Sequence, residues 1–167
     1  MEAVAHAAGG DLSFATIATV NGQTLHNHYH GNIVKPGDLF LIDAGAETEM
    51  GYAGDMSSTI PADKTFTRRQ RDVYDLSARV MVEGLKGLGL MKGNAEDAVR
   101  EGAHALFYPH GLGHMMGLDV HDMENLGELW VGYNGQPKST QFGRKSQRLA
   151  IPLEPGFVHT VEPGIYF

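Results

Sequence analysis

The sequence contains no cysteine, so it can form neither disulfide bonds nor thiolate–metal bonds. Any bound metal ion must be held by nitrogen and oxygen atoms, a donor set that favours manganese, cobalt or zinc. Positive charge is also scarce, since 13 Lys and Arg against 20 Asp and Glu give a net charge of −7. This balance disfavours nucleic acids and anionic membranes as partners.

Long apolar runs are absent as well, and the first residues lack the basic start and apolar stretch of a secretory signal. We therefore expect a cytoplasmic protein with no membrane partner. A chain of 167 residues has the length of one domain and buries roughly two-thirds of its unfolded surface on folding. We expect a single domain over residues 1–167.

Local patterns in the first third of the chain predict both helix and strand. Residues 1–8 are alanine-rich and precede Gly9-Gly10, which is typical of the end of a helix. Residues 16–20 are mostly β-branched and lead to a turn, which indicates a strand. Residues 39–44 are apolar on both alternating faces until Asp43, which predicts an interior strand covered on both sides, with Asp43 largely dry at its end.

Helix signals follow in the middle of the chain. Thr67 and Gln70 have the spacing of a capping box and precede apolar residues at helical intervals, so a helix of about five turns should begin there. Asn94 is suited to cap a second helix that ends near Glu101. Residues 157–161 form a strand-like run toward the C-terminus.

The segment from His110 to Asp122 gathers three imidazoles and two carboxylates among glycines. Imidazole is the commonest protein ligand for transition metals, so a metal-centred site is indicated. The helical zinc motif with two histidines around a glutamate does not match, because Gly111 follows His110 and no acidic residue lies between His110 and His114. The other ligands must come from elsewhere in the chain.

Three carboxylates, those of Asp43, Asp55 and Glu162, end or follow apolar stretches with no Lys or Arg beside them. A buried carboxylate without compensation costs several kcal/mol or becomes neutral, so a bound dication is the simplest counter-charge. Asp43 and Asp55 fit a strand–turn–strand hairpin that brings both acids to one face, where such a pair can bridge two ions. Taken singly, an aspartate near a glycine, such as Asp43 or Asp55, is more typical of a turn.

Four segments together resemble the successive motifs of the proline-specific metallopeptidases of family M24, the Xaa-Pro aminopeptidases and Xaa-Pro dipeptidases. The resemblance implies an α+β fold of the pita-bread type, a curved antiparallel sheet with helices on its outer face. It also implies two divalent metal ions, with manganese expected first and cobalt or zinc as alternatives. The segments are Leu41-Ile42-Asp43-Ala44-Gly45, Gly51-Tyr52-Ala53-Gly54-Asp55, His110 to Asp122, and Thr160-Val161-Glu162-Pro163-Gly164.

By that resemblance the metal ligands would be Asp43 on one ion, Asp55 between both ions, and His114 with Glu162 on the other. Glu162 would also handle the proton of the attacking water. His26 would lie near the N-terminal side of the substrate. The resemblance places His110 and His121 at the scissile carbonyl or the proline-side residue.

Relative to this family pattern we expect the chain to lack the N-terminal start and the C-terminal strands of the catalytic domain, including a second bridging glutamate. Weaker metal binding follows from that expectation, together with association with another copy or with a complementary segment.

Three classes of function stay open on the sequence. The first is metal-dependent hydrolysis of peptides with proline in the second position. The second is a non-catalytic relative or fragment that binds peptides or proteins. The third is a creatinase-like hydrolase acting on a small molecule.

Overall fold

The computed structural model describes residues 1–84, 99–106, 108–123, 126–164 and 166. The chain forms two compact units. Unit 1 consists of Met1–Asp72 and Met116–Val120, and unit 2 consists of Val73–Met115 and His121–Phe167. Helix α2 (Arg68–Gly84) begins in unit 1 and continues in unit 2. Within the described ranges, no helix combines the length and the apolar character needed to cross a membrane.

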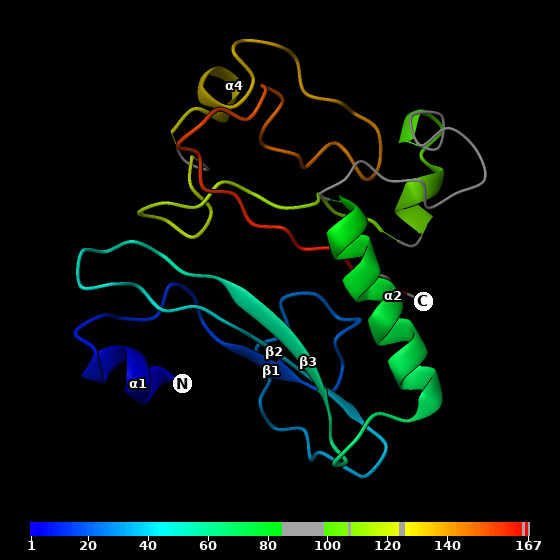
Figure 1. Cartoon of the computed structure of the whole chain (residues 1–167). Coiled ribbons are helices and arrows are strands. Elements are labelled where there is room, and N and C mark those ends of the chain that lie inside the picture. The colour runs from blue at the N-terminus through cyan, green and yellow to red at the C-terminus, as the bar shows by residue number, and fades with distance from the viewer. Residues whose placement is uncertain (85–98, 107, 124–125, 165, 167) are drawn as a thin grey trace. The chain divides into compact units, whose positions relative to one another are not determined.

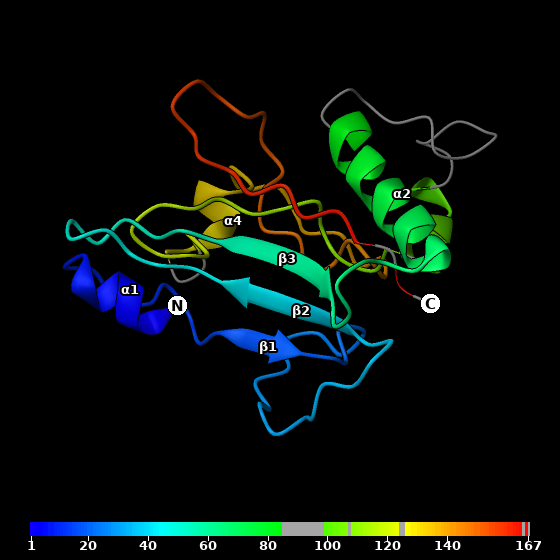
Figure 2. The ribbon, with the colours of Figure 1, turned by 60° about the horizontal axis from the view of Figure 1, so that its bottom comes forward.

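Unit 1 is built on an antiparallel sheet of three strands, β1 (Ile17–Thr19), β2 (Leu39–Ala44) and β3 (Met56–Pro61). Strand β2 lies in the middle, as Figures 1 and 2 show. Asp43 on β2 faces Ile17 of β1 on one side and Ser57 of β3 on the other. The predicted strands are therefore present, and β2 has the predicted bounds.

The hairpin between β2 and β3 continues in register beyond the two strands. The Gly54 amide donates to the Ala46 carbonyl at 3.0 Å, and the Thr48 amide donates to the Tyr52 carbonyl at 2.9 Å. A tight turn closes the hairpin where the Gly51 amide donates to the Thr48 carbonyl at 2.9 Å. Gly51 has φ +80°, a left-handed conformation that glycine adopts without steric cost.

Helix α1 (Glu2–Ala7) matches the predicted N-terminal helix, and Gly9 follows it with φ +82°. The chain then runs beside the hairpin, where the Glu47 amide donates to the Asp11 carbonyl at 2.8 Å and the Ser13 amide donates to the Gly45 carbonyl at 3.2 Å. These bonds fix the part of the hairpin that follows β2. That part continues through the turn to Asp55.

The expectation that β2 is covered on both faces is wrong. Its first five residues are half-buried, Asp43 among them, and Ala44 alone is buried. An apolar pattern on both faces shows that a strand can be buried on both sides. How much of the strand is covered depends on the elements that pack against it.

Unit 2 contains the short helices η1 (Ala103–Leu106) and α4 (Glu128–Val131). Glu128 holds the segment after α4 through ion pairs with Lys138 at 2.7 Å and Arg148 at 2.9 Å. The buried ring of Tyr133 adds a hydrogen bond to the Gln147 carbonyl. The start of the helix predicted from Asn94, residues 94–98, lies outside the described residues.

The predicted capping box at the start of α2 is confirmed. The Gln70 amide donates to Thr67 Oγ1 at 3.3 Å, and the Thr67 amide donates to Gln70 Oε1 at 2.9 Å. The Gln70 side chain also donates to the Gly37 carbonyl at 2.9 Å, which ties the helix start to the loop before β2. Two orphan amides at the helix start are thereby satisfied.

Replacing Thr67 by alanine should lower the free energy of unfolding by about 1 kcal/mol, because the Gln70 amide loses its acceptor. Chemical denaturation followed by circular dichroism measures the change. The matched control is Thr65→Ala, which alters an exposed threonine two residues earlier. Equal stability of the two variants would contradict a capping role for Thr67.

Candidate metal centre and active site

Two segments far apart in sequence lie side by side in unit 2. The Thr160 amide donates to the His114 carbonyl at 2.9 Å, and the Glu162 amide donates to the Leu112 carbonyl at 2.6 Å. Met115 and His159 form an isolated antiparallel bridge between the same segments. The strand-like run predicted over residues 157–161 is thus present as this local pairing, without becoming a regular strand.

Gly113 makes the close approach of these segments possible. A Cβ atom at this position would lie 1.9 Å from the Thr160 carbonyl oxygen, far inside van der Waals contact. Any larger residue would push the segments apart and with them His114 and Glu162. The close approach of the two backbone segments therefore explains why residue 113, beside His114, is a glycine.

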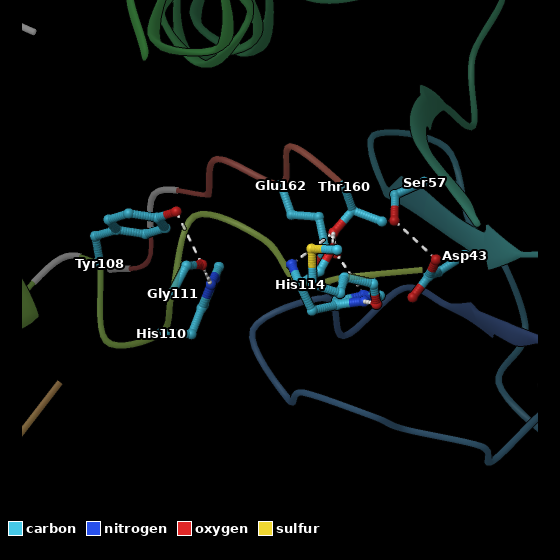
Figure 3. Close-up of polar contacts among 9 residues, drawn as sticks. Asp43, Ser57, Tyr108, His110, Gly111, His114, Thr160 and Glu162 are labelled. Carbon is cyan, nitrogen blue, oxygen red and sulfur yellow. Dashed lines mark hydrogen bonds and ion pairs between the residues drawn. The ribbon is translucent and has the colours of Figure 1, made fainter. Parts of the chain in front are cut away.

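The side chains of His114, Thr160 and Glu162 point toward one another (Figure 3). His114 Nε2 lies 2.9 Å from Glu162 Oε1, and Thr160 Oγ1 donates to the same carboxylate oxygen at 2.5 Å. On the other side of the ring, His114 Nδ1 lies 2.9 Å from the Met115 carbonyl oxygen. The His114 amide donates to Thr160 Oγ1 at 2.9 Å, so the hydroxyl links the two segments.

Both ring nitrogens of His114 therefore face oxygen acceptors. A neutral imidazole carries only one N–H, so it can donate to only one of these oxygens. The environment therefore suits an imidazolium, which donates from both nitrogens. It equally suits a neutral ring whose Nε2 binds a cation that lies beside the carboxylate. Histidines that bind metals commonly donate their other N–H to a backbone carbonyl, as Nδ1 can donate here to Met115. The residues present fit a divalent metal ion.

The electrostatics of Glu162 agree with that geometry. The hydrogen bond from His114 lowers the pKa of Glu162 to about 2, with help from the Thr160 hydroxyl and the electrostatic interactions with His114 and His110, while burial acts in the opposite direction. The carboxylate is therefore ionised at neutral pH and offers negative charge to a cation.

Two further histidines of unit 2 lie at this site. The His121 ring meets the His114 ring edge to face, with 4.2 Å between centroids, and His121 is exposed. His110 is half-buried, and its Nε2 lies 2.7 Å from the Tyr166 hydroxyl.

Sequence reasoning missed Tyr108 and Tyr166. Burial and the negative charge of Glu162 raise the pKa of both phenols. Each tyrosine lies within four residues of a predicted site residue, Tyr108 of His110 and Tyr166 of Glu162. That proximity was the available signal.

In unit 1 the predicted ligands Asp43 and Asp55 lie on the hairpin of β2 and β3, Asp43 near the end of β2 and Asp55 just before β3. Asp43 pairs with Ser57, and Asp55 directly precedes β3, so pairing continued beyond Met56 would make Asp55 a diagonal neighbour of Asp43. The strand pairing confirms the predicted hairpin. Asp43 Oδ1 accepts a hydrogen bond from Ser57 Oγ at 2.8 Å (Figure 3), and Asp55 is half-buried. His26 lies exposed in the loop between β1 and β2, with φ +53°.

The sequence profile of metallopeptidase family M24 matches residues 1–167. The chain belongs to this family. It is 38% identical over 170 residues to the Xaa-Pro aminopeptidase of Escherichia coli K12, covering 87% of this chain and 34% of the relative. It is 34% identical over 175 residues to the Xaa-Pro dipeptidase of Mus musculus, covering 88% of this chain and 34% of the relative. This M24 chain thus spans about a third of the length of these curated relatives.

Solved structures of M24 peptidases show the fold. Zinc-substituted E. coli aminopeptidase P in complex with product matches with a TM-score of 0.62 and 36% identity, over 93% of this chain and 37% of that one. Proline aminopeptidase P II from Yersinia pestis matches with a TM-score of 0.63 and 38% identity, over the same shares. The expected α+β fold of the pita-bread type is confirmed by these structural neighbours.

Acid should weaken the metal-free protein through Glu162. A carboxylate with a lowered pKa contributes stability above its ordinary value near 4.5, and this contribution disappears as pH falls toward about 2. The side chain is 42% exposed, so solvent screening keeps the effect modest. Denaturation in the presence of a chelator should show a larger loss of stability between these pH values for the wild type than for Glu162→Gln.

Glu154→Gln is the control for that experiment, because it removes an exposed carboxylate from the same segment. Its pH dependence should follow the wild type. A Glu162→Gln profile parallel to the wild type across the acid range would contradict the ion pair with His114.

Proposed function

We propose that this chain carries the metal-dependent active site of a peptidase that hydrolyses peptides with proline in the second position, and that residues 1–167 belong to its catalytic domain. The observation that carries the proposal is the pairing of His114 with Glu162 in a member of family M24. The backbone holds this pair, and His114 Nδ1 is anchored on the Met115 carbonyl. Both named relatives act, by their names, on Xaa-Pro peptides.

The proposed metal ligands are Asp43 on one divalent ion, Asp55 bridging two ions, and His114 and Glu162 on the second. Manganese is the ion we propose first, with cobalt or zinc as alternatives, because all four ligands offer nitrogen or oxygen. A zinc-substituted form exists for a structural neighbour.

When bound, the metal ions supply a hydroxide nucleophile and a Lewis acid for the peptide carbonyl. The Glu162 carboxylate, ionised and fixed by Thr160, is placed to accept the proton of the attacking water. His110 and His121 are proposed to contact the scissile carbonyl or the proline-side residue, and His26 the N-terminal side of the substrate. The proline nitrogen must be protonated to leave, so one of these groups returns a proton.

The partner proposed is therefore a peptide, with no nucleic acid or membrane. Cytoplasmic location stays a prediction, as does association with another copy of the chain or with a complementary segment.

Hydrolysis of a tripeptide with proline in the second position tests the proposed function. We expect turnover that requires manganese and is abolished by a chelator, whereas the matched tripeptide with alanine in the second position should be cleaved more slowly. His114→Ala should lower kcat/KM at least about 100-fold, because a metal ligand is lost. His28→Ala, which alters an exposed loop histidine, is the control.

Two outcomes would replace the proposal. Peptide binding that is insensitive to metal and gives no turnover would assign the chain to the non-catalytic class. Breakdown of creatine in place of the tripeptide would assign it to the creatinase-like class.

A further inference from the structure

His110 lies between two tyrosine rings in unit 2. The Tyr108 ring meets the imidazole edge to face, with 4.7 Å between centroids and 72° between planes. The Tyr166 ring does the same, with 5.3 Å between centroids and 82° between planes. Edge-to-face contacts of this kind favour one orientation of the enclosed ring.

The polar contacts of His110 differ at its two nitrogens. Nδ1 lies 2.8 Å from the Gly111 carbonyl oxygen, which can only accept, so the ring hydrogen belongs on Nδ1. Nε2 then carries a lone pair and accepts the hydroxyl hydrogen of Tyr166 at 2.7 Å. Neither bond survives if the imidazole flips, because each nitrogen would exchange places with a carbon.

The two phenols have different acceptors. The Tyr108 hydroxyl donates to the Gly111 carbonyl oxygen at 3.0 Å, the same oxygen that accepts from His110 Nδ1. The Tyr166 hydroxyl donates directly to the imidazole. Tyr108 therefore packs against the ring, while Tyr166 alone bonds to a ring nitrogen.

We propose that Tyr166 is a positioning residue for His110, whose hydroxyl holds the imidazole in one orientation with its hydrogen on Nδ1. Its importance for the reaction rests on the proposed function, in which His110 contacts the substrate. An imidazole that is already correctly oriented meets the substrate without reorganisation. Its fixed orientation should therefore raise kcat more than it strengthens substrate binding.

Nuclear magnetic resonance of the 15N-labelled chain tests this without any need for turnover. In the neutral form of its imidazole, His110 should show one nitrogen of the N–H type and one of the lone-pair type. The signals are assigned by their loss in His110→Gln. In Tyr166→Phe the two nitrogens should move toward a common intermediate shift, because loss of one hydrogen bond changes the ratio of tautomers by up to about tenfold.

Tyr108→Phe is the matched control, since it removes a hydroxyl beside the same imidazole while keeping the ring. Its His110 nitrogens should stay near the wild-type shifts. Unchanged His110 nitrogens in Tyr166→Phe, or an equal change in Tyr108→Phe, overturn the proposal.

A reciprocal measurement covers the case in which Tyr166→Phe does not fold. In His110→Gln the Cζ carbon of Tyr166 should shift, because its hydroxyl loses the nitrogen acceptor, while Cζ of Tyr108 should not. A Tyr166 signal that does not respond contradicts the hydrogen bond.

The kinetic consequence is measured separately on the tripeptide. Tyr166→Phe should lower kcat by up to about tenfold with KM little changed, as expected for one lost hydrogen bond that orients a group. Altered His110 nitrogens with unchanged kcat would overturn the positioning role while leaving the peptidase proposal intact. Absence of turnover in the wild type would instead count against the proposed function and leave the spectroscopic test standing.

Discussion

The site in unit 2 depends on one constraint. An imidazole and a carboxylate must lie opposite each other on two backbone segments that are joined by hydrogen bonds. Thr160 and Glu162 donate their amides across to the segment that carries His114. Gly113 allows the approach, because a side chain there would collide with the Thr160 carbonyl. Charge and geometry then reinforce each other, since the hydrogen bond from His114 keeps the pKa of Glu162 low and the carboxylate ionised. A cation that takes the place of the hydrogen between His114 and Glu162 would find both metal-binding side chains already in position.

In unit 1 the register of the β2–β3 hairpin positions the two predicted acidic ligands. The antiparallel hairpin keeps backbone pairing from β2 to Gly54, and regular pairing of this kind would place Asp43 and Asp55 on one face. The two acids of unit 1 and the His114–Glu162 pair of unit 2 thus each rest on backbone pairing. Side-chain packing contributes less to these positions, because Asp43 and Asp55 are only half-buried.

Much of this could be predicted from local chemistry. The capping box at Thr67 and the hairpin after β2 depend on neighbouring residues, and both are confirmed. The fold class came from resemblance to a family, and the solved relatives confirm it. Burial of β2 could not be predicted, because coverage depends on distant elements. Tyr108 and Tyr166 were missed because an aromatic residue near an apolar segment is usually core, and their contacts with His110 and Glu162 exist only after folding.

The most direct test of the central claim is pulsed electron paramagnetic resonance of manganese bound to chain labelled with 15N-histidine. We expect a hyperfine coupling to an imidazole nitrogen that disappears in His114→Ala and persists in His28→Ala. Manganese that binds without a histidine coupling, or a coupling unchanged by His114→Ala, would contradict the claim that His114 and Glu162 hold the ion.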